Sequence, residues 1–319
     1  MHLLRTTALA ALVVGSLGLA GSASAEDKTY TIGVSVPTAD HGWTGGVDFF
    51  AQQAVERLGK AYPNLKFVLA TAPDSTKQAA DLEDMVTTRK IDALVILPGD
   101  PDAMTASIKK VKDAGKWVTV IDRALSQPGI EDLYVAGDNP GLGATTAAYF
   151  KKALPKGGNI VVLRGLPIPI DKQRVDAFME GIKGTDIKVL DSQFANWNRD
   201  DGYKVMQDFL TKYPKIDAVW AQDDDTLVGA LKAIKEAGRD KDIWSVGGAG
   251  MNQIVKMVAA GSTQVPVDVS YNPNMVATAI DLTALHFAAG AQVDGKMIIN
   301  STLITKENAA QFDYANTPF

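Results

Sequence analysis

The sequence predicts an α/β protein of two lobes, each built around a parallel β-sheet. Short β-rich runs alternate with helical patterns along most of the 319 residues. In the helical patterns apolar residues recur at i, i+3, i+4 and i+7, as Val47, Phe50, Ala51 and Ala54 do. The predicted strands are too many for one small doubly wound domain, and no Ser- or Pro-rich linker interrupts them, so we expect two abutting lobes.

The first 25 residues carry the pattern of an export signal. Arg5 supplies the positive start, an apolar run covers residues 8–20, and Ser22–Ala25 form a small-x-small cleavage site. The apolar run is shorter than the ~20 residues that a membrane span needs. We therefore expect cleavage after Ala25 and an exported mature chain.

Strands and helices follow in order through the mature chain. The predicted strands are Tyr30–Val36, Lys66–Thr71, Ala93–Leu97, Trp117–Ile121, Leu133–Ala136, Asn159–Leu163, Lys188–Leu190, Ala218–Ala221, Ile243–Val246 and Val267–Ser270. The predicted helices are Gly45–Ala61, Thr76–Arg89, Ala103–Ala114, Leu142–Leu154, Asp171–Ile182, Asp200–Tyr213, Asp225–Ala237 and Asn252–Ala260.

Continuous apolar strands such as Ala93–Leu97 indicate parallel sheets covered on both faces. We expect the first lobe to use the four strands before about Ala136, and the second lobe to start at Gly137. A further strand near Ile298–Ile304 is expected to pack back onto this framework.

The composition excludes several classes of function. A net charge of −5 argues against duplex DNA or an anionic membrane as the main partner, since both need a basic face. The absence of cysteine excludes thiol catalysis, zinc–thiolate sites and disulfides, and three histidines leave little room for other metal or triad chemistry. The motifs GxSxG, HExxH and GxxxxGK[ST] do not occur. We expect no cofactor, no bound metal and no nucleic acid.

Polar and aromatic residues follow the carboxyl ends of the predicted strands, where open parallel sheets bind ligands. They are Asp40, His41, Trp43, Asp122, Arg123, Arg174, Trp197 and Asp223. Carboxylates and Arg make charge-assisted hydrogen bonds to vicinal hydroxyls, and aromatic faces cover the C–H faces of a sugar ring. The set is typical of a site for a polyhydroxylated ligand.

Each residue also has a plain structural alternative. Asp100 or Asp225 could be only a helix N-cap, and Asp122–Arg123 only a surface ion pair. Trp43 and Trp197 could be core residues, Tyr271 an interlobe packing residue, and His41 a loop residue with no role. Asp122 and Asp223 could instead be the paired carboxylates of an exported carbohydrate-active enzyme.

A series of motifs in order resembles one family. Over nearly its whole length the mature chain resembles the periplasmic sugar-binding proteins of ATP-driven (ABC) importers, in the ribose-binding-protein group of type I periplasmic binding proteins. The motifs are Pro37–Trp43, Leu97–Asp100, Ile121–Arg123, Gly137–Asn139, Arg174 before Ala177–Phe178, Ser192–Trp197, Ala221–Asp224 before Gly229–Leu231, and Tyr271–Pro273.

The resemblance implies two Rossmann-like lobes joined by three hinge strands near Ala136, Tyr271 and Ser301. One lobe would be 26–136 plus 272–301 and the other 137–271 plus 302–319. The resemblance also implies a periplasmic monomer that binds a solute, does no chemistry and delivers the solute to an ABC permease. A chemoreceptor is a further partner that the family allows.

Carried over by position, the implied ligand contacts are His41, Trp43, Asp122, Arg123, Arg174, Trp197, Asp223 and Tyr271, with Asp40 as an added polar group. Two positions depart from the ribose binders, because Leu97 and the glycines of Val246–Ala249 stand where those proteins carry an amide and a carboxylate. Buried hydroxyls without partners cost about 1–3 kcal/mol each. We therefore expect a different monosaccharide, a sugar alcohol or an amino sugar.

Overall fold

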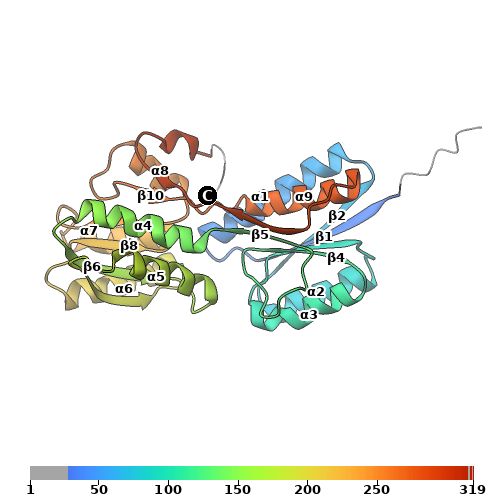
Figure 1. The fold of residues 1–319 in the computed structure, drawn as a ribbon, viewed down its shortest axis with the longest axis horizontal. Helices are drawn as coiled ribbons and strands as arrows, with labels where there is room; N and C mark the ends of the chain where they lie inside the picture. Colours follow the sequence, from blue (N-terminus) through green and yellow to red (C-terminus); the bar gives the residue numbers. More distant parts are fainter. Residues whose placement is uncertain (1–27, 315–316, 318) are drawn as a thin grey trace, which may run out of the picture.

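The computed structural model describes residues 28–314, 317 and 319. The predicted export signal lies outside these described residues. Figure 1 shows two lobes side by side, with the labels from α4 to α8 in one and those from α1 to α3 in the other. The predicted α/β class with two parallel sheets is confirmed.

The first lobe contains a six-stranded sheet in the order β11-β5-β4-β3-β1-β2, and all its neighbours pair in parallel. Its strands are β1 (Tyr30–Pro37), β2 (Leu65–Ala72), β3 (Ala93–Ile96), β4 (Trp117–Ile121), β5 (Leu133–Gly137) and β11 (Gly295–Ile299). The helices α1 (Gly42–Ala61) and α9 (Met275–Ala289) pack on one face, and α2 (Ser75–Thr87) and α3 (Pro101–Asp113) on the other. Every residue of β3 is buried, as expected for a strand covered on both faces.

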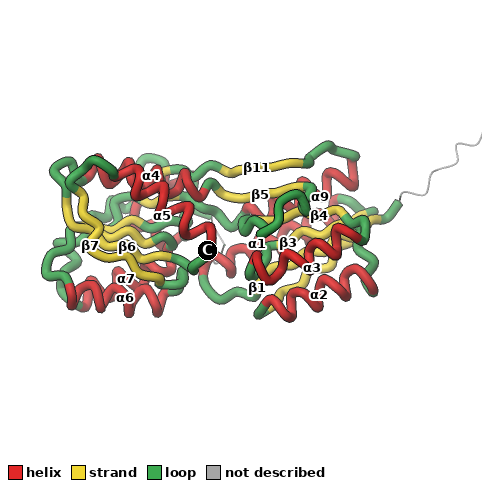
Figure 2. The backbone as a smooth tube through the Cα atoms, turned by 60° about the horizontal axis from the view of Figure 1, so that its bottom comes forward, coloured by secondary structure: helices red, strands yellow, loops and turns green. Residues whose placement is uncertain are grey.

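The second lobe contains a four-stranded parallel sheet in the order β7-β6-β8-β9. Its strands are β6 (Gly158–Arg164), β7 (Ile187–Phe194), β8 (Ala218–Ala221) and β9 (Trp244–Val246). In Figure 2, α4 (Asn139–Ala153) and α5 (Pro169–Ile182) lie on one side of this sheet, and α6 (Arg199–Lys212) and α7 (Asp224–Glu236) on the other. Helix α8 (Asn252–Ala259) follows β9.

The chain passes between the lobes three times, at segments that we call the crossings. They are residues 137–139, 270–274 and 300–302. The second leads from β10 (Asp268–Val269) to α9, and the third leads from β11 to β12 (Leu303–Ile304). β10 and β12 pair antiparallel, and the short 3-10 helix Ala309–Gln311 follows.

The structure corrects several expectations. The first sheet takes β5 and β11 in addition to the four strands expected from the apolar pattern, and both strands fall almost wholly within the segments 26–136 and 272–301 that the resemblance implied for this lobe. The strand expected near Ile298–Ile304 is two strands in different lobes, because residues 300–302 form a crossing. The helices predicted from the sequence do not include α9. Its sequence is apolar almost throughout and therefore shows no clear helical stripe.

Several helices begin two or three residues before the apolar periodicity does. For α3 and α4 the reason is local, because the first turn is held by a polar cap rather than by burial. Asp100 and Asp138 accept backbone N–H bonds from the first turns of these two helices. Within the described residues, no helix is long and apolar enough to cross a membrane.

Gly143 tests how tightly α4 packs against α5, and Gly59 in α1 serves as the comparison. A Cβ at Gly143 would lie 2.1 Å from the backbone oxygen of Arg174 in α5, whereas a Cβ at Gly59 in α1 would meet nothing nearer than 3.9 Å. Gly143→Ala should lower the free energy of unfolding by roughly 1–3 kcal/mol because α4 and α5 must separate. Gly59→Ala should raise it by about 0.5–1 kcal/mol. Urea unfolding of both variants measures this, and equal shifts would contradict the packing.

Candidate functional site

Eight of the predicted residues line one cavity between the lobes. The free space between them amounts to about 20 Å³, roughly the room for one water molecule, so the two lobes lie close together in this structure. They are His41, Trp43, Asp122, Arg123, Arg174, Trp197, Asp223 and Tyr271, joined by Ile170 and Gly248, which were not predicted. Asp40 is not among them and lies in an adjoining groove.

Asp122 stands at the carboxyl end of β4 in a left-handed conformation, with φ of 60°. This conformation is unusual for a residue other than glycine and persists only where the surroundings hold it. The hydroxyl of Tyr134 donates to its carbonyl at 2.6 Å, and the hydroxyl of Tyr271 donates to its carboxylate. Burial raises the pKa of Asp122, while Arg123 and the Tyr271 bond oppose that rise.

Arg123 is buried beside Asp122. Its Nη1 donates to the carbonyls of Pro98 and Gly99, which follow β3. Asp122 and Arg123 are 4% and 6% exposed, so the surface ion pair considered from the sequence is wrong.

A hydrogen-bonded series links the acidic and basic sides of the cavity. Arg174 Nε donates to Asn139 Oδ1 at 2.8 Å, Asn139 Nδ2 donates to the Tyr271 hydroxyl at 2.9 Å, and that hydroxyl donates to Asp122. The Arg174 guanidinium also donates to the Gln222 carbonyl at 3.0 Å and lies 4.3 Å from the centroid of the Tyr271 ring. Asn139 was missed as a site residue, although it stood in a motif that the sequence singled out.

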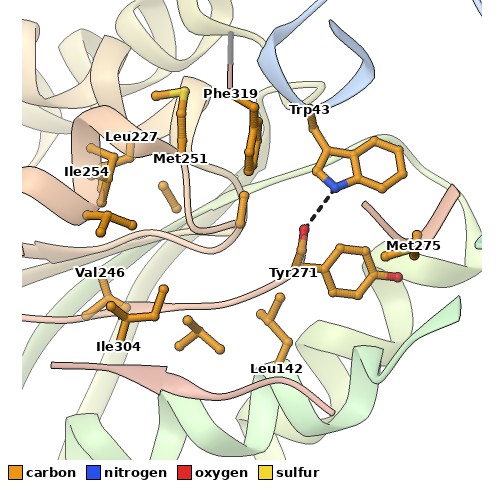
Figure 3. Packing of buried hydrophobic residues seen from close by; sticks show 14 of the residues in the cluster. Trp43, Leu142, Leu227, Val246, Met251, Ile254, Tyr271, Met275, Ile304 and Phe319 are labelled. Carbon is orange, nitrogen blue, oxygen red and sulfur yellow. Dashed lines mark hydrogen bonds between the residues drawn. The ribbon is translucent and has the colours of Figure 1, made fainter. Parts of the chain in front are cut away.

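Two tryptophans form part of the cavity wall. Trp43 Nε1 donates to the carbonyl of Tyr271 at 2.9 Å, and Figure 3 shows this bond beside Leu142 and Phe319. Trp197 has a φ of 53° and packs on Gly165, where a Cβ would lie 1.9 Å from the indole. Both indoles are about as buried as core residues, yet both line the cavity.

Asp223 combines a structural and a cavity-lining position. It caps α7, because its Oδ1 accepts from Asp225 N at 2.8 Å. Burial raises its pKa to about 6, against the opposing charge of His41. Of the two caps considered from the sequence, Asp100 does cap α3, whereas Asp225 lies inside the first turn of α7 and does not cap it.

His41 joins the site to the surface. Its Nδ1 lies 2.5 Å from Asp40 Oδ1. Burial disfavours the imidazolium, but the bond to Asp40 and the charge of Asp223 outweigh burial and raise the pKa of His41. The bond to His41 lowers the pKa of Asp40 to about 2. Asp40, whose side chain is 77% exposed, therefore contacts the site through His41 rather than lining it.

A second pair of carboxylates, Asp224 and Asp268, lies fully buried next to the cavity. Asp224 accepts from the backbone N–H groups of Gly248, Gly250 and Met251, at 2.7–3.0 Å. Asp268 Oδ2 accepts from Gly250 N at 3.1 Å. The pair thus holds the loop that carries Gly248, and burial raises the pKa of Asp268 to about 7. Asp268 was missed, although a charged residue inside an apolar strand was a signal for it.

The chemistry of the lining is that of a binding site rich in donors and acceptors. Among the described residues, no group of three or more His, Cys, Asp or Glu side chains is placed to hold a metal ion.

Comparison with known proteins supplies a family. A profile described as a periplasmic binding protein domain matches residues 32–291. The ribose import binding protein of Bacillus subtilis is 32% identical over 221 residues, which cover 69% of this chain and 70% of that protein. The xylitol-binding protein of Mycolicibacterium smegmatis is 31% identical over 242 residues, covering 73% of this chain and 66% of that protein.

A solved structure has the same fold. It is an ABC transporter solute-binding protein from Bacillus halodurans with bound myo-inositol. Its TM-score is 0.81 at 24% identity, and the match covers 91% of this chain and 99% of that one.

Asp268→Asn tests the buried carboxylate pair. Asp268 keeps its proton up to about pH 7 when folded, against a usual pKa of 3.8. The folded protein therefore binds more protons than the unfolded chain between these pH values, and the free energy of unfolding falls as pH rises. One such proton gives a slope of up to about 1.4 kcal/mol per pH unit. Urea unfolding at pH 5, 6, 7 and 8 should show a smaller decline for Asp268→Asn.

The matched control is Asp240→Asn, at an exposed position on the same lobe. It should keep the slope of the unmodified protein. Equal slopes for the Asp268 variant and the unmodified protein would contradict a proton held by this pair.

Proposed function

This chain belongs to the periplasmic binding protein family, and from that premise we propose that it captures one small polyhydroxylated solute between its lobes for import. The proposed ligand is a monosaccharide, sugar alcohol or amino sugar, held without chemistry and passed to an ABC permease. The observation that carries the proposal is the lining of the cavity, which combines buried carboxylates, two guanidinium groups and two indole faces.

The geometry suits vicinal hydroxyls. Asp122 and Asp223 each use one carboxylate oxygen within the protein, to Tyr271 and to the first turn of α7 respectively. Arg174 and Arg123 each commit part of their guanidinium to backbone carbonyls. The remaining carboxylate oxygens and guanidinium N–H groups can bond a ligand that presents both donors and acceptors on neighbouring atoms.

The indoles supply the apolar part of recognition. Trp43 belongs to the first lobe and Trp197 to the second, so closure would bring their faces to opposite sides of a ring or carbon chain. Gly248 has no side chain to bond a hydroxyl, and Leu97, directly after β3, is buried and apolar. These two positions favour a ligand other than ribose. The names of two relatives, a ribose import binding protein and a xylitol-binding protein, support the class of ligand.

The remaining roles follow from the same proposal. We assign 26–136 plus 272–301 to one lobe and 137–271 plus 302–319 to the other, with hinge motion at the crossings. We place the mature protein in the periplasm, as a monomer that meets the permease and, as a further partner, a chemoreceptor.

The alternative is a carbohydrate-active enzyme that uses Asp122 and Asp223. The matched relatives are solute-binding proteins, which favours capture over turnover. Chromatography of each bound sugar after prolonged incubation tests this, because an enzyme would convert the sugar and a receptor would return it unchanged.

A thermal-shift screen identifies the ligand. The protein is unfolded, dialysed and refolded to remove bound solute, then screened against pentoses, hexoses, amino sugars, sugar alcohols and inositols. A ligand at 100 times its dissociation constant should add about 2.7 kcal/mol to the free energy of unfolding. One strong hit is expected. A flat screen would overturn the proposed ligand class.

Substitution of the cavity wall tests the site. Arg174→Ala and Trp197→Ala should each weaken binding of the hit by roughly 2–5 kcal/mol, the cost of truncating a buried polar or anchoring contact. Isothermal titration calorimetry measures the loss, and circular dichroism checks that each variant is folded. Arg89→Ala, on the surface of the first lobe, should bind normally. Normal binding by both cavity variants would show that the site is elsewhere.

A further inference from the structure

The N-terminus of α1 is held by a residue of the opposite lobe. The backbone N–H of Gly42, the first residue of α1, donates to Oδ2 of Asp225 in the first turn of α7. In several other helices the acceptor is the residue just before the helix, as Asp74 is for α2 and Asp100 for α3. The residue before α1 is His41, whose Nδ1 contacts Asp40 and Thr44 instead.

Asp225 is rigidly placed for this contact. Its Oδ1 accepts from Arg199 Nε at 3.0 Å and also from Arg199 Nη2, and its side chain is 8% exposed. Arg199 and Asp225 both belong to the second lobe, so the second lobe presents a fixed carboxylate to α1. A carboxylate at a helix N-terminus is stabilised by the N–H group and by the helix dipole.

The contact lies apart from the crossings. Among the residues that the structure describes, the bond from Gly42 to Asp225 is the one hydrogen bond between the lobes that uses no residue of a crossing. The approach is close, since a Cβ at Gly42 would lie 2.7 Å from Asp225 Oδ2. Gly42 stands between His41 and Trp43 of the cavity wall, and Asp225 is two residues from Asp223. The bond therefore joins the two lobes directly beside the cavity wall.

We propose that Asp225 is a positioning residue of ligand capture, which draws the lobes together by capping α1 from the opposite side of the cleft. The inference rests on the proposed function, because it concerns closure of the same site. A ligand that binds the closed form has an apparent affinity scaled by the fraction of protein that is closed. The cap raises that fraction without touching the ligand.

Distance measurements in the ligand-free protein test the cap directly. The chain has no cysteine, so Asp102→Cys in α3 and Lys172→Cys in α5 can carry two spin labels without side reactions. Both positions are exposed in the first turns of helices at the cleft. Asp225→Ala should lower the ratio of closed to open protein by roughly two- to thirtyfold, the range expected for loss of a helix cap.

A double-mutant cycle separates the cap from a general loss of structure. Gly42→Ala pushes a methyl group against Asp225. In the protein that keeps Asp225, this substitution should shift the distances toward the open form. In the Asp225→Ala background it should add no further shift, because the contact is already gone. Asp200→Ala, at an exposed first-turn position of α6, is the matched control and should leave the distances unchanged. Additive effects of the two substitutions would overturn the proposal.

Binding kinetics give the second readout. The probes are xylitol and ribose. Asp225→Ala should raise the dissociation rate constant by the factor by which it lowers the closed-to-open ratio, and it should leave the association rate constant unchanged because the cap forms after encounter. Unchanged closed fractions and unchanged dissociation together would overturn the proposal. If neither probe binds the unmodified protein, xylitol and ribose are excluded as its ligands, and the ligand-free distances still decide the role of Asp225.

Discussion

The hydroxyl of Tyr271 is the hydrogen-bonding group on which the rest of the site depends. It lies in the second crossing, donates to Asp122 of the first lobe and accepts from Asn139, which in turn holds Arg174 of the second lobe. Its ring packs so closely on Gly137 that a Cβ there would lie 2.2 Å away. One buried side chain thus orients an acid and a base that belong to different lobes, at the place where the chain passes between them.

Three consecutive aspartates after β8 show how position decides the role of identical side chains. Asp223 caps α7 and lines the cavity, Asp224 is fully buried against backbone N–H groups and Asp268, and Asp225 reaches the opposite lobe. Isolated charges at such depth would be too costly to bury. Each carboxylate is offset by several N–H donors, and the raised pKa of Asp223 and Asp268 reflects the burial that remains.

The fold was predictable where the chain repeats one local pattern. A continuous apolar strand followed by an amphipathic helix identifies each parallel unit, as with β3 and α3. The secondary-structure prediction was wrong for two segments in which the apolar residues show no single buried face. Helix α9 packs within the first lobe on an almost wholly apolar sequence, and the run near Ile298–Ile304 divides between two lobes because only the crossings decide where each half pairs.

The sequence by itself determined the α/β class, the order of elements and the residue types at the carboxyl ends of the strands, because these depend on local periodicity and on the general geometry of parallel sheets. The resemblance to a known family, more than the spacing of residues, predicted which side chains line the cavity. Only the tertiary structure decided that Asn139 orients Arg174, that Asp40 reaches the cavity through His41, and that Asp225 contacts α1. The contacts of Asn139 with Arg174 and of Asp225 with Gly42 join residues 35 and 183 positions apart, and such partners are chosen by tertiary packing rather than by neighbours along the chain.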